Sequence, residues 1–211
     1  MRIQNIKAIG FDVDGTLYHT PEAMGAAVGK ILIEKAAAML NRDPDELAEE
    51  YLERREELRS NTKTLRSFGL PGEEIFEQVW NSIPINRYIH KDEKLMSLIS
   101  ALKKKYTLFV ISNGRMVEVD RKLGGLGLDY HDFDPRIYCY DQGWMKPDPQ
   151  PFLAAIEALS LRPEEIVYVG DREDIDIEGA HGVGMQAIYV GGVSEQAEAS
   201  IETVYDIVNI L

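Results

Sequence analysis

Short apolar runs alternate with stretches of helical periodicity along most of the chain. Helices are predicted at residues 92–102, 116–126, 149–159, 175–181 and 201–211, where apolar side chains recur at helical spacing. The apolar runs predict buried strands at IKAIGF (6–11), TLFVI (107–111), RIYCY (136–140), EIVYV (165–169) and QAIYV (186–190). This alternation predicts an α/β fold, a doubly wound parallel sheet with helices on both of its faces.

The connection between the first two strands is far longer than a simple crossover. Parallel strands need about a dozen residues to connect, whereas residues 20–91 separate these two runs. Thr20-Pro21, Asp43-Pro44 and Pro71-Gly72 are typical helix starts, and they predict helices over 20–40, 43–58 and 71–80. We therefore expect a core domain of residues 1–19 and 92–211, and a smaller inserted α-helical cap domain of residues 20–91.

Composition and charge narrow the class of protein. No apolar run approaches the roughly 20 residues that span a bilayer, and the N-terminal segment lacks the apolar core of a secretory signal. The single cysteine, Cys139, excludes an internal disulfide and favours a reducing compartment, so we expect a cytoplasmic protein that does not bind membranes. The net charge of −13 argues against a nucleic-acid polymer as partner, because such binding depends on lysine and arginine.

Polar side chains follow three of the predicted strands at the point where each strand ends. They are Asp12 and Asp14, then Ser112 and Asn113, then Asp171 and, one helical turn later, Asp176; Lys146 stands in the loop GWMKPDPQPF. Because the carboxyl ends of parallel strands meet at one edge of a sheet, we expect these residues to converge. Four carboxylates would repel one another there unless a cation were present, and Mg²⁺ is favoured by an oxygen-rich ligand set.

Four sequence blocks carry a family resemblance. DVDGTLY, ISNG, KPDPQPF and VGDREDIDIEGA resemble, in order and spacing, the four motifs of the haloacid dehalogenase (HAD) superfamily. The resemblance covers the whole predicted sheet domain and implies a Rossmann-like HAD core, with an insert similar to the helical cap type of the superfamily. Residues 62–95 are more loosely similar to the pyrimidine 5′-nucleotidase branch. There Thr62, Lys63 and Arg66 are either substrate-contacting residues or surface of the insert.

The resemblance implies a role for each matching residue. Asp12 is expected to be the nucleophile that forms an aspartyl-phosphate, and Asp14 the general acid and base. Ser112, Asn113 and Lys146 are expected to bind the phosphoryl group, with Lys146 also bridging to the nucleophile. Mg²⁺, for which Mn²⁺ or Co²⁺ would substitute, is expected on Asp12, the Asp14 backbone carbonyl and Asp171. Thr16 and Asp176 are expected around these ligands, with Asp176 orienting Lys146 or supporting the metal.

Several functions remain compatible with these motifs. The leading hypothesis is an Mg²⁺-dependent phosphatase acting on a small organic phosphate monoester, with a nucleoside monophosphate as one candidate. A sugar phosphomutase would use the same motifs and return the phosphoryl group to a sugar. A 2-haloacid dehalogenase is disfavoured by Asp14, because a departing halide needs no proton. A catalytically silent regulatory module is disfavoured because every chemical position is intact. The preferred metal, the oligomeric state and the cap residues that set specificity stay open.

Overall fold

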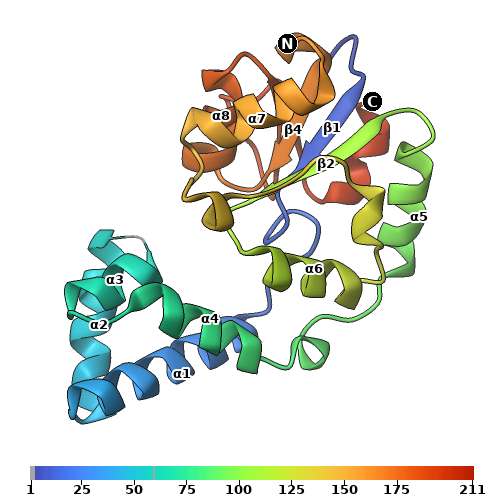
Figure 1. The fold of residues 1–211 in the computed structure, drawn as a ribbon. Coiled ribbons are helices and arrows are strands. Elements are labelled where there is room, and N and C mark those ends of the chain that lie inside the picture. Colours follow the sequence, from blue (N-terminus) through green and yellow to red (C-terminus); the bar gives the residue numbers. More distant parts are fainter. Residues whose placement is uncertain (1–2, 59) are drawn as a thin grey trace. The chain divides into compact units, whose positions relative to one another are not determined.

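The computed structural model describes residues 3–58 and 60–211. The chain divides into two compact units, Met1–Thr20 with Ile89–Leu211 and, separately, Pro21–Tyr88. Within the described residues, the first unit is built on a six-stranded parallel sheet in the order β3-β2-β1-β4-β5-β6 (Figure 1). Its strands are β1 (Ala8–Phe11), β2 (Thr107–Ser112), β3 (Arg136–Tyr138), β4 (Ile166–Gly170), β5 (Gln186–Val190) and β6 (Ala199–Ile201). The predicted parallel α/β fold is confirmed.

The helices of this first unit lie on both faces of the sheet. They are α5 (Glu93–Leu102), α6 (Met116–Gly125), α7 (Pro149–Leu159) and α8 (Glu178–Gly182). Helix α5 lies in the connection from β1 to β2, and α6 lies in the connection from β2 to β3. Helix α7 connects β3 to β4, and α8 connects β4 to β5. Since such connections are right-handed, the two pairs lie on opposite faces (Figure 1).

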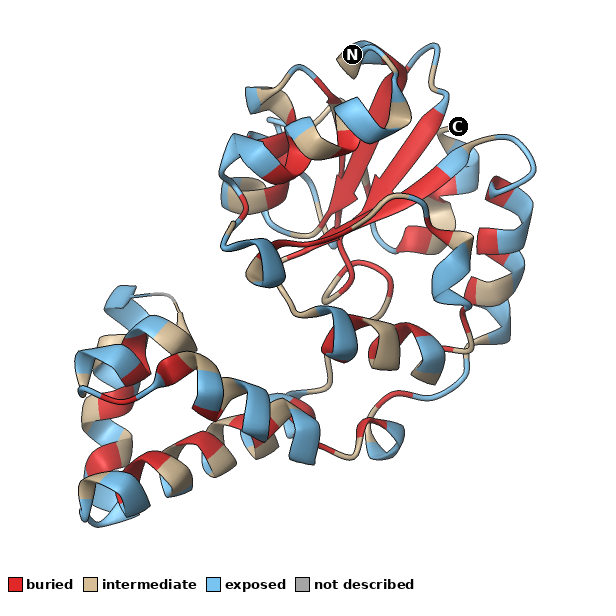
Figure 2. Cartoon of the chain, viewed as in Figure 1, coloured by how far each residue is buried: buried red, intermediate tan, exposed pale blue. Residues whose placement is uncertain are grey.

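The register of the sheet aligns the carboxyl ends of its central strands. Phe11, the last residue of β1, pairs with Val110 of β2 on one side and with Val169 of β4 on the other. All four residues of β1 are buried (Figure 2). The loops that follow β1, β2 and β4 therefore leave the sheet at the same edge.

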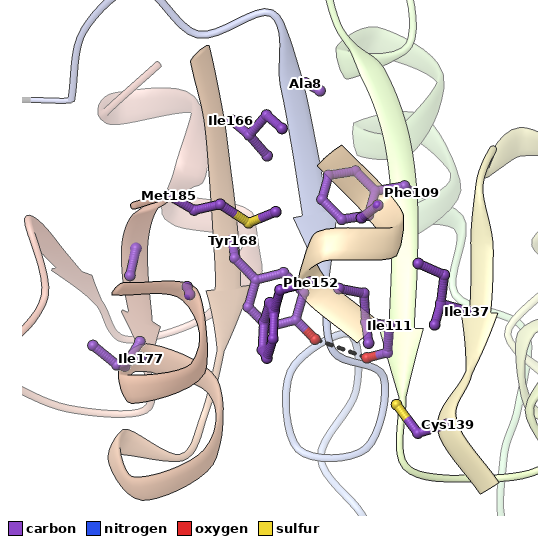
Figure 3. Close-up of a cluster of buried hydrophobic side chains, with 13 residues drawn as sticks. Ala8, Phe109, Ile111, Ile137, Cys139, Phe152, Ile166, Tyr168, Ile177 and Met185 are labelled. Carbon is purple, nitrogen blue, oxygen red and sulfur yellow. Dashed lines mark hydrogen bonds between the residues drawn. The ribbon is translucent and has the colours of Figure 1, made fainter. Parts of the chain in front are cut away.

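A cluster of buried hydrophobic side chains fills the space between the sheet and the helices α7 and α8 (Figure 3). The ring of Phe152 meets the ring of Tyr168 edge to face, with centroids 5.2 Å apart. Burying a side chain of this size contributes about 1.5–3 kcal/mol. The Tyr168 hydroxyl is satisfied inside the cluster, because it donates to the carbonyl oxygen of Ile111 at 2.7 Å.

The second unit consists of the helices α1 (Glu22–Leu40), α2 (Pro44–Leu58), α3 (Asn61–Ser67) and α4 (Gly72–Ser82). Met24, Val28, Leu32 and Ala36 of α1 are buried, and their i,i+4 spacing gives one apolar stripe. The Asp43 carboxylate caps α2 by accepting from the amides of Asp45 and Glu46 at 2.9 and 3.2 Å. Across the residues described, no helix is both long and apolar enough to cross a bilayer.

Two predictions about local structure were wrong, and one helix was missed. Residues 201–211 do not form an α-helix: β6 ends at Ile201 and a 3₁₀ segment covers Val204–Asn209. Ile201, Val204 and Ile207 are buried at three-residue intervals, a spacing that suits the 3₁₀ repeat and also resembles the i,i+3 pattern of an α-helix. Strand β3 stops at Tyr138, so Cys139 opens a 3₁₀ turn, although it is buried. Helix α3 was not predicted, because seven mostly polar residues are too few to show periodicity.

Candidate active site

A tight loop follows β1 and carries the first two candidate residues. The Asp12 amide still belongs to the sheet, since it donates to the Val169 carbonyl at 2.9 Å. The chain then turns back, and the amide of Gly15 donates to the carbonyl of Tyr18 at 3.1 Å. Gly15 has φ +90°, and a Cβ placed on it would lie 2.1 Å from the Asp171 carboxylate. Only glycine lets the loop approach Asp171 in this way.

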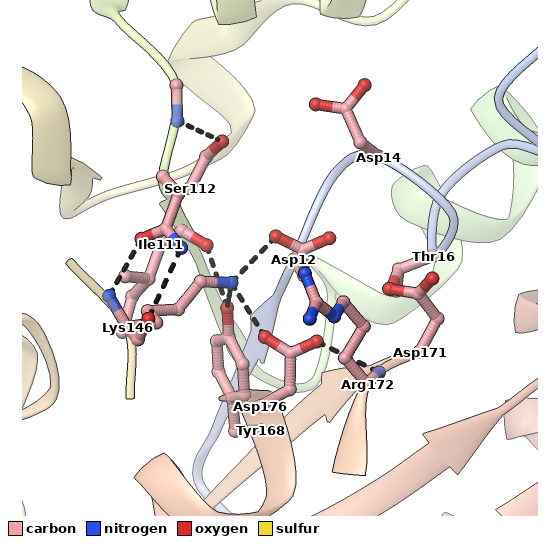
Figure 4. Close-up of polar contacts among 12 residues, drawn as sticks. Asp12, Asp14, Thr16, Ile111, Ser112, Lys146, Tyr168, Asp171, Arg172 and Asp176 are labelled. Carbon is pink, nitrogen blue, oxygen red and sulfur yellow. Dashed lines mark hydrogen bonds and ion pairs between the residues drawn. The ribbon is translucent and has the colours of Figure 1, made fainter. Parts of the chain in front are cut away.

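Lys146 lies at the centre of the site. Its buried ammonium donates to Asp12 Oδ1 and Asp176 Oδ1, each at 2.7 Å, and to the Tyr168 hydroxyl at 2.9 Å (Figure 4). Burial alone would lower the pKa of this ammonium, but the carboxylates of Asp12 and Asp176 raise it well above its ordinary value. Lys146 is therefore a permanent positive charge beside the predicted nucleophile.

The residues after β2 hold the Lys146 loop in place. The Lys146 amide donates to Asn113 Oδ1 at 2.8 Å, and Asn113 Nδ2 donates back to the Lys146 carbonyl at 3.4 Å. The buried Ser112 hydroxyl accepts from the Gly114 amide at 3.1 Å. The Asn113 side chain thus fixes the lysine loop, while its backbone amide is the group predicted to hold a phosphoryl oxygen.

Three carboxylates form a compact acidic group beside Lys146. Asp12, Asp171 and Asp176 each offer an oxygen within 4.8 Å of the others. Burial raises the pKa of Asp12 to about 7 even though Lys146 opposes the shift, and burial also raises the pKa of Asp171. Excess negative charge of this kind fits a bound divalent cation, which would stabilise the ionised carboxylates.

Asp171 lies beside two other residues that were expected around the metal, Thr16 and Asp176. The Thr16 hydroxyl donates to Asp171 Oδ1 at 3.4 Å. Asp176 contacts Lys146 and also belongs to the acidic group. The Asp14 carboxyl points away from this group (Figure 4). The Asp14 carboxyl therefore does not join the acidic group, and the ligand role of the Asp14 backbone carbonyl stays a prediction.

The segment after β4 positions Asp176 by an irregular turn. A π-helical turn spans Glu173–Ile177, a feature that often marks functional sites. The Arg172 amide donates to Asp176 Oδ2 at 3.2 Å. A Cβ on Gly170 would lie 2.3 Å from the Asp176 Cβ, so the glycine permits this close approach. The Arg172 guanidinium pairs with Asp174 at 3.2 Å.

The Asp14 carboxyl has its own set of partners. Lys122 Nζ donates to Asp14 Oδ2 at 2.8 Å and to Glu118 Oε1 at 2.5 Å. The Tyr18 hydroxyl donates to Asp14 Oδ1. Lys122 is only 1% exposed and Glu118 only 6% exposed, so this group is part of the interior.

Sequence reasoning missed Lys122, Glu118 and Tyr168. Glu118 and Lys122 alternate on α6 with Val119 and Leu123, and all four are buried on the same stripe. A charged i,i+4 pair inside an apolar stripe was the available signal, although such pairs usually lie on the surface. Tyr168 gave no signal, because an aromatic residue in a buried strand is expected to be ordinary core. In the insert, Arg66 pairs with Glu73 at 3.0 Å, which suits the surface interpretation of that residue.

Comparison with known proteins gives the same family as the motifs. The model of the haloacid dehalogenase-like hydrolases matches residues 6–184. The chain is 30% identical to the glyceraldehyde 3-phosphate phosphatase of Methanopyrus kandleri, over 88% of this chain and 84% of that protein. A solved HAD phosphatase from Thermococcus onnurineus is 27% identical, with 97% of each chain covered and a TM-score of 0.75. A 2-haloacid dehalogenase from Pseudomonas syringae pv. Tomato DC3000 is 26% identical over 97% of each chain, with a TM-score of 0.64.

Proposed function

Because the chain belongs to the haloacid dehalogenase-like hydrolases, we propose that it is a phosphatase that hydrolyses small organic phosphate monoesters with the help of Mg²⁺. The observation that carries the proposal is the buried contact of 2.7 Å between Lys146 Nζ and Asp12 Oδ1. This contact places the positive charge of Lys146 beside the Asp12 carboxylate, at the edge of the sheet where β1 ends. Asp14 follows two residues later as a group able to exchange a proton with a leaving oxygen.

The proposed reaction has two steps. Asp12 Oδ2, the oxygen that Lys146 does not bind, attacks phosphorus; the bond from phosphorus to the ester oxygen breaks, and that oxygen takes a proton from Asp14. A water molecule then gives a proton to Asp14 and attacks phosphorus, which releases inorganic phosphate and restores the Asp12 carboxylate. Lys146 offsets the repulsion between carboxylate and phosphate in both steps.

A metal ion would complete the charge balance. Asp12, Asp171 and the Asp14 backbone carbonyl would hold Mg²⁺, and the bound ion would neutralise phosphoryl oxygens. Ser112 and the Asn113 amide lie at the end of β2, next to β1, where they would receive the remaining phosphoryl oxygens. Asp176 keeps the Lys146 ammonium in position through its contact of 2.7 Å.

Asp14 decides between phosphatase and dehalogenase. An alkoxide leaving group requires a proton, whereas a halide does not, so a carboxyl group at position 14 favours ester cleavage. The phosphomutase alternative uses the same residues. Release of inorganic phosphate without a bisphosphate primer separates hydrolysis from transfer.

The substrate is proposed as a small phosphorylated metabolite. The Methanopyrus kandleri relative is named for a triose phosphate, and the loose nucleotidase resemblance keeps nucleoside monophosphates as candidates. We assign substrate selection to the helical unit Pro21–Tyr88, because the other unit already contains every residue proposed for the chemistry.

Phosphate release tests the proposal directly. Purified protein would be assayed with p-nitrophenyl phosphate, glyceraldehyde 3-phosphate, phosphoserine and nucleoside monophosphates, each with Mg²⁺ and with a chelator. We expect Mg²⁺-dependent release from at least one substrate and none from the Asp12→Asn variant, while exposed Asp148 changed to Asn keeps full activity. Chloride release from 2-chloropropionate in place of phosphate release would show the protein to be a dehalogenase.

A further inference from the structure

The Asp14 carboxyl is held by two groups from different parts of the core. The Tyr18 hydroxyl binds one of its oxygens, and the Tyr18 backbone pairs with that of Asp14 across the turn of the loop. Lys122, which lies on α6, binds the other oxygen at 2.8 Å. The carboxyl is about one-third exposed, while the lysine ammonium beneath it is buried. Asp14 is therefore reachable from outside, but its orientation is fixed from inside.

The buried ion pair of Lys122 and Glu118, which lies beneath Asp14, is a poor source of stability by itself. Glu118 Oε1 accepts from Lys122, but Glu118 Oε2 is buried with no hydrogen-bond partner within residues 3–58 and 60–211. Burying such a carboxylate is costly, and replacing buried ion pairs by apolar groups is often neutral or stabilising. The neighbouring Val119 and Leu123 already provide apolar contacts for α6. A role beyond holding the helix is indicated.

Resting on the proposed function, we propose that Lys122 is a positioning residue for Asp14: it fixes the carboxyl that transfers the proton, and Glu118 holds Lys122 in place. Proton transfer requires a donor within hydrogen-bond reach and at a defined angle to the leaving oxygen. A carboxyl on a loop has free rotation about two bonds. Lys122 and Tyr18 each take one oxygen and remove that freedom.

The proposal predicts a loss that depends on the leaving group. An alkyl alcohol leaves only with a proton from Asp14, whereas p-nitrophenolate leaves without one. The value of kcat/KM covers the steps up to transfer of the phosphoryl group to Asp12. Removing Lys122 should therefore lower kcat/KM by about 100-fold for an alkyl phosphate and by only about 5-fold for p-nitrophenyl phosphate.

The experiment compares the ratio of these two kcat/KM values among folded variants. Lys122→Met is made alone and together with Glu118→Gln, because the double variant leaves no uncompensated buried charge and decides the outcome if the single variant does not fold. Lys103→Met is the matched control, since Lys103 is an exposed lysine of the same unit that pairs with Asp132.

We expect the ratio of alkyl to aryl kcat/KM to fall about 20-fold in the Lys122 variants and to stay unchanged in the control. An equal loss with both substrates, or no loss, in a variant with native circular dichroism would overturn the positioning role alone. Wild-type protein that releases no phosphate from any ester with Mg²⁺ would overturn the proposed function as well.

Discussion

Replacing Asp12 by Asn is expected to stabilise the metal-free protein at alkaline pH while it abolishes turnover. Burial raises the pKa of Asp12 from 3.8 to about 7, despite the opposing effect of Lys146. The folded state therefore binds the Asp12 proton more tightly than the unfolded state does. This preference favours folding below about pH 3.8 and is lost as the pH rises to about 7.

The size of the effect follows from the shift. At about 1.4 kcal/mol per pKa unit, the ionised Asp12 carboxylate costs the folded protein about 4 kcal/mol at about pH 8. Asparagine has the shape of the protonated acid and keeps an oxygen for Lys146. Asp12→Asn should thus raise the free energy of unfolding by about 4 kcal/mol at about pH 8 and by about 2 kcal/mol at about pH 5.

Urea denaturation in the presence of a chelator measures this difference at both pH values, with Asp148→Asn as the exposed control. Adding Mg²⁺ should stabilise the wild type and have little effect on Asp12→Asn, because the variant lacks a ligand carboxylate. A variant that is less stable than the wild type at about pH 8, or a difference that does not change with pH, would refute the electrostatic reasoning.

Three further substitutions probe the supports of the site. Tyr168→Phe removes a hydroxyl that contacts Lys146 and the Ile111 carbonyl. We expect the free energy of unfolding, measured by urea denaturation, to fall by about 1–3 kcal/mol. An unchanged free energy of unfolding would contradict a stabilising role of these buried contacts. Gly15→Ala places a methyl group 2.1 Å from the Asp171 carboxylate at φ +90°, so Mg²⁺ affinity measured by calorimetry should fall. Asp171→Asn should also weaken Mg²⁺ binding, yet leave the chelated protein at least as stable, since burial disfavours the ionised carboxylate; undiminished affinity would remove Asp171 from the ligand set.

The sequence could predict that the site residues converge, because their convergence depends only on the order and direction of the strands. Asp12 and Asp171 follow strands that run side by side in one direction, and parallel strands end at the same edge. Lys146 could be placed only through its motif, since it lies in a loop. The catalytic and metal-binding roles of these residues stay predictions, and the proposed assays are designed to test them.

The buried residues beneath Asp14, which are Lys122 and Glu118, could not be predicted from the sequence, for a physical reason. Lys122 and Glu118 are read from sequence as a surface pair, because charged residues are almost never fully buried without a partner. The partner of Lys122 that is no neighbour in sequence, Asp14, is more than one hundred residues away along the chain. Strand β6 was not predicted for a similar reason. Its three residues are too few to show an alternating pattern, and its pairing with β5 determines that it is a strand.

The central place of β1 has a consequence for the way the protein is made. This strand is translated first, yet its two neighbours begin only at Thr107 and Ile166. A ribosome must therefore complete the whole helical insert before the apolar run of residues 8–11 can enter a sheet. Long-range parallel pairing is slow and leaves apolar segments exposed to association. The strand that leads to the proposed nucleophile thus stays without its two neighbours until most of the chain has been synthesised.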